Sequence, residues 1–386
     1  MSILKILHVF TDDKFFDHIS SVFDKIEGVN NLYVFFSKKK NYKFKYSQSY
    51  HKIQFVYDKK KYLSLFKDPS IGVVFYHSLP PSFYEYVLNT DENKINIWWA
   101  WGYDIYSTGI VDIKLYLPLT IDVKDKVDRL QFGKLKFYKS KIRCFIKDKF
   151  GFDLKVHKYR KVLPKINYVI PILPIEYELI SQNRFFCGEL LMERASFRDF
   201  DDSMIPETYP LSNGNILLGN SASFENNHLD IMKIFKTIDV MDRKIIMPLS
   251  YGNKLLAKIL KSESDSKYLV LESFLPPPEY NEMLKSCSYA VFGSLRQHAI
   301  GNINLCLRYG IKVFLYKDGI TYKQLTKDGY HVFTIDFHLN EHELSKPLLK
   351  EQIIHNQNIY KSIIQRNGLS ALDRAIKNIK PFSNQI

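Results

Sequence analysis

A polar segment in the last third of the chain carries the side chains best suited to binding an anion. It contains Arg296, Gln297, Gly301 and Asn302. These residues follow the apolar run 289–292 and precede an amphipathic, helix-like pattern at 303–307. The start of a helix offers free backbone N–H groups, and arginine presents a planar fork that fits phosphate oxygens. There is no G-x-G-x-x-G and no P-loop signature. The pattern therefore predicts either a phosphate site or an ordinary strand-to-helix turn with a surface arginine.

A second group of polar side chains lies at the ends of predicted strands in the first half of the chain. It comprises His8, Asp12, Asp13, His77 and Asp104. Ligands bind outside the carboxyl ends of strands in open α/β sheets, so this group is a candidate site for acid–base chemistry. Each residue alone is also typical of a helix cap or of a solvated surface.

The elements that position these residues read as alternating strands and helices, which predicts βαβ units and mainly parallel sheets. We expect a first domain at 1–190, a turn-rich linker at 191–214 and a second domain at 215–386. The last helical pattern, about 348–377, is long enough to pack back on the first domain. The sequence lacks a run of 18 apolar residues, so no transmembrane helix is predicted.

Composition fits a globular protein that meets something anionic. The 386 residues are 46% hydrophobic and 25% charged, and the net charge is +14. The four cysteines are scattered, which argues against a zinc site or a disulfide framework and suits a reducing cytosol.

Basic residues concentrate at 134–165, the basic belt, which has twelve Lys/Arg and two acidic residues. Apolar residues alternate with them at roughly helical spacing, which is typical of a helix that binds an anionic membrane surface. A solvated helix that packs on its own domain gives the same pattern.

Several motifs, in the same order along most of the chain, resemble glycosyltransferase family 56. Members of that family are TDP-N-acetylfucosamine:lipid II N-acetylfucosaminyltransferases of enterobacterial surface polysaccharide synthesis. The motifs are HVF-x-x-D at 8–13, W-x-W-G-x-D at 99–104, I-L-x-G-N-S at 216–221, P-x-x-Y at 248–251, the region 275–287, and R-Q-x-x-I-G-N at 296–302. The chain departs from the family at 14–18, where a proline–histidine-rich turn is replaced. It departs again at His298 and Ala299, which stand in a stretch that is richer in glycine in the family.

The resemblance implies an α/β fold of the GT-B class, in which two Rossmann-like domains face a central cleft and the C-terminal helix packs back on the first domain. It also implies a metal-independent hexosyltransferase that needs no cofactor. The donor would be a TDP-linked amino-dideoxyhexose such as Fuc4NAc. The acceptor would be an undecaprenyl-diphosphate-linked saccharide of enterobacterial common antigen or O-antigen synthesis. The enzyme would bind the anionic inner-membrane surface as a peripheral protein on the cytoplasmic face of the cell inner membrane, and would bind no nucleic acid.

The resemblance also assigns roles to residues. Those expected to bind the donor diphosphate are Arg296, Gln297, Gly301, Asn302, Gly219, Asn220 and Ser221, and those expected to bind the nucleoside are Tyr251 and Glu279. Asp104 is the preferred general base, because Trp99 and Trp101 would raise its pKa by partial desolvation. Asp13 is the second candidate and His8 the third. A core position for Tyr251 and a capping role for Asp104 remain alternatives.

Two other classes of function remain open at this point. A nucleic-acid-binding protein would use the basic belt and its aromatic residues, although the sequence contains no nucleic-acid-binding motif. A GT-B-shaped sugar-nucleotide epimerase would share the fold, but it would need no lipid and hence no basic belt.

Overall fold

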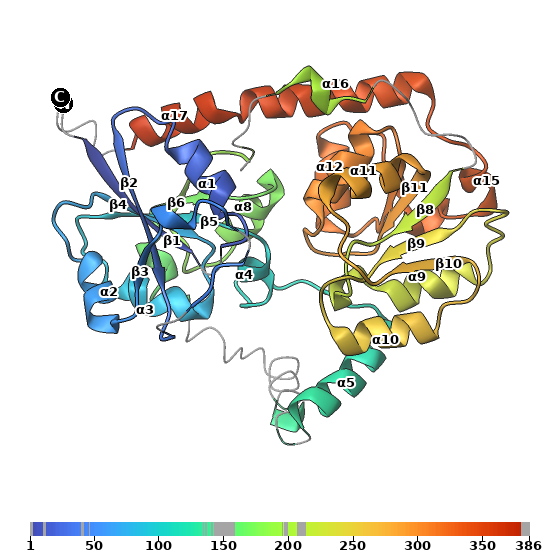
Figure 1. The fold of residues 1–386 in the computed structure, drawn as a ribbon, viewed down its shortest axis with the longest axis horizontal. Coiled ribbons are helices and arrows are strands. Elements are labelled where there is room, and N and C mark those ends of the chain that lie inside the picture. Colours follow the sequence, from blue (N-terminus) through green and yellow to red (C-terminus); the bar gives the residue numbers. More distant parts are fainter. Residues whose placement is uncertain are drawn as a thin grey trace. The chain divides into compact units, whose positions relative to one another are not determined.

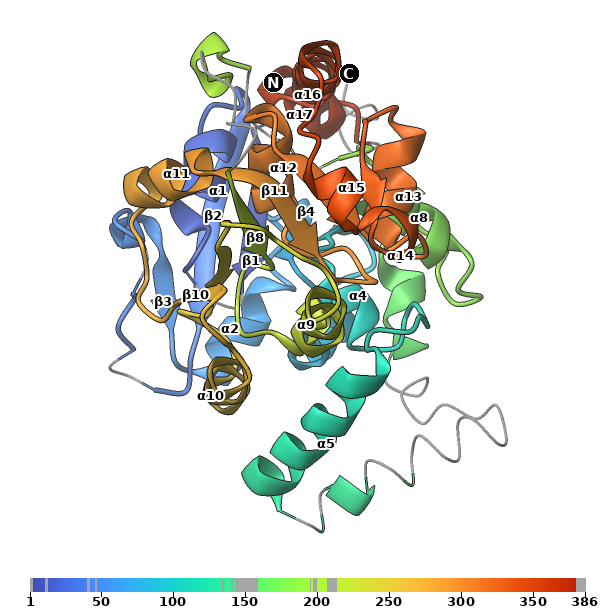
Figure 2. The same cartoon turned by 90° about the vertical axis from the view of Figure 1, so that its right-hand side faces the viewer.

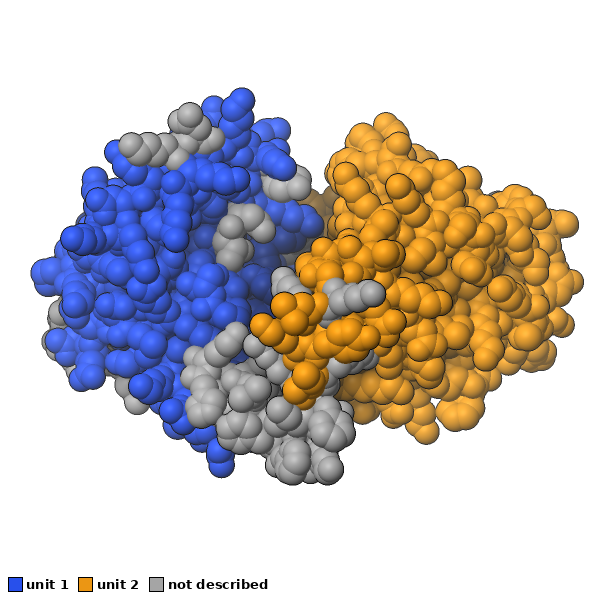
Figure 3. All heavy atoms as spheres, turned by 90° about the horizontal axis from the view of Figure 1, so that it is seen from below, with its two compact units in different colours: residues 1–112, 154–200, 364–386 blue, residues 113–153, 201–363 orange. Residues whose placement is uncertain are grey.

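The computed structural model describes residues 3–10, 13–39, 42–45, 47–133, 135, 137–139, 142, 159–194, 196, 200–206 and 214–379. The chain divides into two compact units, which are coloured separately in Figure 3. The first unit comprises Met1–Asp112, Leu154–Phe200 and Ile364–Ile386. The second comprises Ile113–Asp153 and Asp201–Ile363.

The first unit is built on a seven-stranded sheet with the strand order β3-β2-β1-β4-β5-β6-β7 (Figure 1). All of its strand pairs are parallel. The strands are β1 (Leu4–Phe10), β2 (Val29–Phe36), β3 (Gln54–Val56), β4 (Val73–His77), β5 (Ile95–Trp99), β6 (Tyr168–Ile170) and β7 (Glu189–Leu190). The helices are α1 (Phe16–Phe23), α2 (Lys59–Leu65), α3 (Tyr84–Asn89), α4 (Tyr103–Tyr106), α8 (Pro174–Ser181) and α17 (Leu369–Lys377).

The second unit has a six-stranded, wholly parallel sheet with the order β10-β9-β8-β11-β12-β13. The strands are β8 (Asn215–Leu218), β9 (Ile245–Pro248), β10 (Tyr268–Leu271), β11 (Cys287–Phe292), β12 (Lys312–Leu315) and β13 (Phe333–Thr334). The helices are α5 (Pro118–Phe132), α9 (His228–Phe235), α10 (Lys254–Ser262), α11 (Pro277–Lys285), α12 (Ile300–Arg308), α13 (Ile320–Lys327), α14 (Ile335–His338), α15 (Glu341–Leu344) and α16 (Lys350–Arg366), which continues into the first unit.

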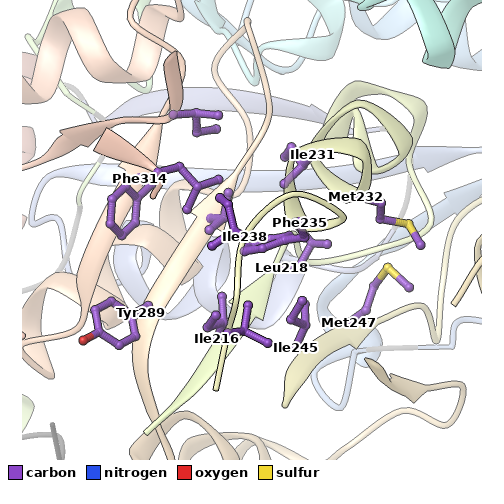
Figure 4. Close-up of a cluster of buried hydrophobic side chains, with 14 of the residues drawn as sticks. Ile216, Leu218, Ile231, Met232, Phe235, Ile238, Ile245, Met247, Tyr289 and Phe314 are labelled. Atoms are coloured by element: carbon purple, nitrogen blue, oxygen red, sulfur yellow. The ribbon is translucent and has the colours of Figure 1, made fainter. Parts of the chain in front are cut away.

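The central strands are mostly apolar and buried, as expected where helices cover both faces of a parallel sheet. Every residue of β4 and of β11 is buried. In the second unit, side chains from β8, β9 and β11 pack against α9, where Ile231 and Phe235 are buried (Figure 4). The strand–helix–strand pattern predicted for 289–316 is confirmed as β11, α12 and β12.

The C-terminal helix returns to the first unit, as predicted. Leu372 and Ile376 on α17 and the following Ile379 belong to the same buried cluster as Ile6, Phe23 and Phe75 of the first unit. This contact requires the chain to pass from the second unit to the first within α16, whose last residues belong to the first unit.

The compact units differ from the predicted ranges at Ile113–Asp153, which group with the second unit. Hydrogen bonds explain the grouping. Leu117 N–H donates to Asn227 Oδ1 at 2.9 Å, and Thr120 donates to Asp230 Oδ2 from its backbone N–H at 3.0 Å and from its hydroxyl at 2.6 Å. Helix α5 packs on α9 and α10 (Figure 2). The contact reaches its last turn, where Gln131 Oε1 accepts a hydrogen bond from Asn253 Nδ2, just before α10, at 3.2 Å.

Most of the basic belt lies outside the described residues, so its predicted helix is not part of the fold described here. None of the helices formed by the described residues is long and apolar enough to cross a bilayer.

Candidate functional site

The second unit has a switch point between β8 and β11. These two strands are neighbours in the centre of the sheet, with β9 on the far side of β8 and β12 on the far side of β11. The chain therefore leaves the two strands in opposite directions, which opens a crevice at their carboxyl ends. The loops that border it are 219–227 after β8 and 293–299 after β11. Both contain residues that the sequence singled out.

The loop after β8 is held in place by its own polar groups. Gly219 has φ +65°, and a Cβ there would lie 2.6 Å from His228 Nε2, so only glycine fits. Asn226 Nδ2 donates to Asn220 Oδ1 at 3.1 Å and to the Ser221 carbonyl at 2.8 Å. Asn220 and Ser221 are buried. The predicted diphosphate ligands of this loop thus form a rigid turn, with their side chains largely engaged inside it.

The loop after β11 leads directly into α12. Gly293 lies against the first loop, because a Cβ there would be 2.4 Å from the Asn226 carbonyl oxygen. Ala299, which precedes the helix, has φ +57° and ψ 24°, and its side chain does not cap the helix. A side chain at Gly301 would meet no atom within 4 Å. Within the described parts of the chain, the first turn of α12 therefore has no side-chain cap from its N-cap residue and has open space beside Gly301, which leaves room for an anion at its N–H groups.

Arg296 faces a carboxylate from the other loop. Its Nη2 lies 3.6 Å from Glu225 Oε1, and its Nη1 donates to the Gln297 carbonyl at 2.5 Å. Glu225 also accepts a hydrogen bond from the Ser223 hydroxyl. Burial opposes ionisation of Glu225, but the Arg296 charge and the serine outweigh it, so the pKa of Glu225 lies below its ordinary value. Gln297 is buried, and its Oε1 has no hydrogen-bond partner among the described residues.

His298 joins this cluster from the same loop. Its Nδ1 lies 3.2 Å from Ser294 Oγ. Burial and the adjacent Arg296 charge lower the pKa of His298 to about 4, against the opposing effect of Glu225. The imidazole is therefore neutral at pH 7. Glu225 and His298 were absent from the predicted site. The sequence feature that could have identified them is an acidic residue in one loop and a histidine in another, each loop following a buried strand.

A pocket of about 300 Å³ opens beside these loops. It is bounded by the carboxyl ends of β8, β9 and β10 and by α11 and α12, and its lining residues are Asn220, Pro248, Ser250, Tyr251, Leu271, Ser273, Phe274, Leu275, Pro277, Tyr280, Asn281, Asn302 and Leu305. Tyr251 is half-exposed, and its hydroxyl accepts a hydrogen bond from Asn220 Nδ2 at 2.9 Å. Phe274 is 74% exposed. Two aromatic rings with accessible faces thus line a concave site that also contains amide side chains.

Of the two predicted nucleoside ligands, Tyr251 lines the pocket and Glu279 does not. Glu279 lies in the first turn of α11, on its exposed side. The residues of α11 that line the pocket are Pro277, Tyr280 and Asn281. The helical period places 279 away from the face that 277 and 281 share.

The candidate bases lie in the first unit, at the ends of β1 and β5. Asp104 is completely buried. Its Oδ2 accepts from Leu79 N–H and from Trp98 Nε1–H, both at 2.7 Å, and its Oδ1 accepts from Trp101 N–H at 2.9 Å. Burial raises the pKa of Asp104, and these three donors oppose the rise. The predicted direction of the pKa shift is thus confirmed, and the geometry gives Asp104 the contacts of a residue that fixes two loops.

Asp13 and His8 are also buried. Asp13 Oδ2 accepts from Lys45 N–H at 2.8 Å and from Ser47 N–H at 2.9 Å, so it holds the loop that follows β2. His8 Nδ1 lies 2.9 Å from His77 Nε2, and its Nε2 lies 3.0 Å from Asn31 Oδ1. Burial lowers the pKa of His8 to about 4. Both ring nitrogens of His8 have partners in the core.

Metal binding has no evident site in the part of the chain that the structure describes. No three His, Cys, Asp or Glu side chains gather there in a way that could hold an ion.

Comparison with known proteins points to one reaction class. Residues 199–364 match the model of a family described as 4-alpha-L-fucosyltransferase glycosyl transferase group 56. The matched range contains both switch-point loops and the pocket. The resemblance to this family is confirmed over that range, and it supports a glycosyltransferase.

Solved structures agree on the fold. A glycosyltransferase from Rickettsia africae ESF-5 is 12% identical with a TM-score of 0.57, and the match covers 100% of this chain and 99% of that one. A lipopolysaccharide outer core galactosyltransferase in its apo form is 11% identical with a TM-score of 0.53, covering 97% and 99%. The N-terminal domain of Candida albicans trehalose-6-phosphate phosphatase is 9% identical with a TM-score of 0.60, covering 98% and 97%. The predicted α/β fold of the GT-B class, with two Rossmann-like domains, is confirmed.

Proposed function

We propose that this glycosyltransferase uses a TDP-linked amino-dideoxyhexose as donor and an undecaprenyl-diphosphate-linked saccharide as acceptor. The reaction needs no metal ion and takes place at the cytoplasmic face of the inner membrane, in the synthesis of a bacterial surface polysaccharide. The observation that supports the donor class most strongly is the pocket of about 300 Å³ beside the free N-terminus of α12. A nucleoside fits a pocket of that size, and its phosphates fit the helix terminus.

The pocket has the chemistry of a nucleoside site. The exposed faces of Tyr251 and Phe274 offer stacking surfaces for a planar base. The Asn281 and Asn302 side chains line the same pocket and can each donate and accept hydrogen bonds. Asn220 holds the Tyr251 hydroxyl, so the ring is oriented before a ligand arrives. Base recognition by stacking and amide hydrogen bonds follows from this arrangement.

The main chemical task of this site is to stabilise the negative charge of the leaving group. When the bond between the sugar C1 and the diphosphate breaks, negative charge develops on the diphosphate and must be stabilised. Arg296 and the backbone N–H groups at the start of α12 supply fixed positive potential there. The acceptor hydroxyl then attacks C1 and loses its proton to a base, for which Asp13 and Asp104 remain the candidates from sequence.

Membrane association is supported by exposed apolar side chains at the end of α5 and just beyond it. Leu130 is 76% exposed, Leu135 73% and Ile142 58%. Leu130 lies just before the basic belt, and Leu135 and Ile142 lie within it. Apolar residues that insert between lipid headgroups and lysines that meet anionic lipid are the two components of peripheral binding.

The donor class is tested by thermal unfolding of the protein with TDP, UDP, GDP and ADP, with and without EDTA. A ligand at a hundredfold excess over its Kd stabilises the folded state by about 2.7 kcal/mol. We expect a shift that is selective for TDP and unchanged by EDTA. A selective shift with UDP or GDP would replace TDP in the proposal, and the absence of a shift with all four would contradict a nucleotide-sugar donor.

A substitution in the pocket tests whether TDP binds there. Tyr251→Ala removes a stacking surface, and loss of base–aromatic stacking costs roughly 1–3 kcal/mol. We expect TDP to bind about ten- to a hundredfold more weakly to this variant. Phe337→Ala is the control: it removes a ring that is 66% exposed, against 49% for Tyr251, and that lies outside the pocket, so this variant should bind TDP as the wild type does.

A further inference from the structure

The cluster formed by Glu225, Arg296 and His298 has hydrogen-bonding capacity that its own contacts leave unused. Across the residues that the structure describes, the Arg296 guanidinium donates one hydrogen bond, to the Gln297 carbonyl. Its 3.6 Å approach to Glu225 is an ion pair and exceeds the length of a hydrogen bond. A guanidinium has five N–H donors, so several remain for a ligand. Arg296 is also only 11% exposed, which means that its charge acts in a weakly screened environment.

His298 adds a neutral donor to this charge. Ser294 Oγ lies 3.2 Å from Nδ1 of the neutral ring, and when the hydroxyl donates to Nδ1 the ring proton is on Nε2. The Nε2–H is then a hydrogen-bond donor that does not depend on protonation of the ring. The charged and titratable groups around His298 are Arg296 on its own loop, Glu225 on the loop after β8 and the buried His228 on α9.

The cluster and the pocket share the same two loops. Asn220 lines the pocket, and Glu225 follows five residues later in the loop after β8. Asn302 lines the pocket from the first turn of α12, and His298 precedes that helix by two residues. Asn227 Nδ2 joins the loops by donating to the Gly293 carbonyl at 2.8 Å. The free N–H groups of α12 therefore lie along the chain between the pocket and the cluster.

We propose that this cluster binds the sugar-linked phosphate of the donor, with His298 Nε2 donating to a phosphate oxygen and Glu225 acting as a positioning residue for Arg296. The inference rests on the proposed function, since it assumes a nucleoside diphosphate in the pocket. It adds two residues, Glu225 and His298, to the site. His298 stands at a point where the chain departs from the motif of the family that it resembles, so this contact is a feature of this chain.

The test compares TMP with TDP, which differ by the phosphate that the cluster is proposed to bind. Binding of each to the full-length protein is measured by isothermal titration calorimetry at pH 7.5. A hydrogen bond to a charged group is worth roughly a tenfold change in affinity or more. We expect His298→Ala to weaken TDP binding about tenfold and to leave TMP binding within twofold. His298→Gln, which retains a neutral donor, should restore part of the loss, and His342→Ala on the exposed side of α15 should bind both nucleotides normally.

A double-mutant cycle separates positioning from a general loss of structure. Introduced into the wild-type protein, Glu225→Gln should weaken TDP binding. Introduced into the Arg296→Lys variant, it should have little further effect on TDP binding, because the glutamate acts through the arginine. Equal loss of TMP and TDP in the His298 variants would overturn the phosphate contact. Tighter TDP binding by Glu225→Gln would overturn the positioning role, since it would mean that the carboxylate competes with the ligand for Arg296. If the wild type binds TDP through Tyr251 and the cluster variants bind TDP as tightly as the wild type, the inference fails and the proposed function stands. If the wild type binds neither TMP nor TDP, both fail.

Discussion

Replacing Asp104 with asparagine separates a catalytic role from a structural one. Three N–H groups point at this carboxylate, two at Oδ2 and one at Oδ1. An asparagine has one oxygen, so whichever way the amide turns, at least one donor faces an NH2 group. A buried donor that loses its partner costs about 1–3 kcal/mol, and loss of the charge-assisted bonds adds to this. We therefore expect Asp104→Asn to lower the free energy of unfolding by roughly 2–4 kcal/mol.

Asp13→Asn is the matched comparison. Lys45 N–H and Ser47 N–H both donate to Oδ2 of Asp13, so an amide oxygen in that position keeps both hydrogen bonds. The expected loss of stability is therefore smaller than for Asp104→Asn. The two aspartates are both buried and both lie just after a strand, so the comparison tests how the placement of the donors sets the loss.

Urea unfolding followed by tryptophan fluorescence measures both variants. The three tryptophans of the chain, Trp98, Trp99 and Trp101, all belong to the first unit, and Trp98 and Trp101 donate directly to Asp104, so the signal reports the first unit. Sugar transfer is then measured at a temperature where every variant is folded. An Asp104→Asn protein that is as stable as the wild type but inactive would refute the structural reasoning and return Asp104 to the role of base. Loss of activity in Asp13→Asn alone, with little loss of stability, would assign the base to Asp13.

Two other outcomes follow from buried and exposed groups. Burial raises the pKa of Glu176 from 4.5 to about 7. Between these two pH values the folded state keeps a proton that the unfolded state loses. The free energy of unfolding therefore falls as the pH rises through this range, by a total of roughly 3 kcal/mol. Urea unfolding at pH 5 and pH 8 should show this slope reduced in Glu176→Gln and retained in Glu178→Gln, an exposed site on the same helix; an unchanged slope in the first variant would contradict the assignment. Leu130→Asp should reduce binding to vesicles that contain anionic lipid about tenfold, because a leucine side chain that becomes buried in the membrane contributes roughly 1.5–3 kcal/mol to binding. Leu349→Asp, at a similarly exposed site, is the control and should bind the vesicles like the wild type.

The switch-point loops could be located from the sequence because each follows a short, mainly apolar run that forms a strand. The pattern at 289–316 contains a buried strand, a polar turn, an amphipathic helix and a glycine stop, and every part of it appears in the fold. The local pattern placed Arg296 in the loop after β11 and Asn302 in the first turn of α12, which is where the structure has them. It was also enough to place Gly219, whose positive φ and close approach to His228 only glycine allows.

Contacts between residues that are far apart in the sequence could not be predicted from local patterns. Glu225 meets Arg296 across 71 positions of sequence because β8 and β11 are neighbours in the sheet, and strand order is set by tertiary packing. The grouping of α5 with the second unit depends on hydrogen bonds to Asn227 and Asp230. Asp104 was expected to be partly desolvated by neighbouring tryptophans. Its pKa is indeed raised, but its burial is complete and Trp98 donates to it directly.

Three asparagines explain how loops at the edge of a sheet hold a fixed shape. Asn226 ties Asn220 to the backbone of its own loop, and Asn220 passes that constraint to the Tyr251 hydroxyl. Asn227 joins the Gly293 carbonyl to the segment before α5, donating to Gly293 and accepting from Leu117 N–H. An amide side chain can do this because it donates and accepts at once. Binding a diphosphate to groups that are already ordered avoids the entropy of ordering them on arrival. In the proposed donor site, this rigidity would let fixed dipoles stabilise the charge that develops on the leaving group, without having to move.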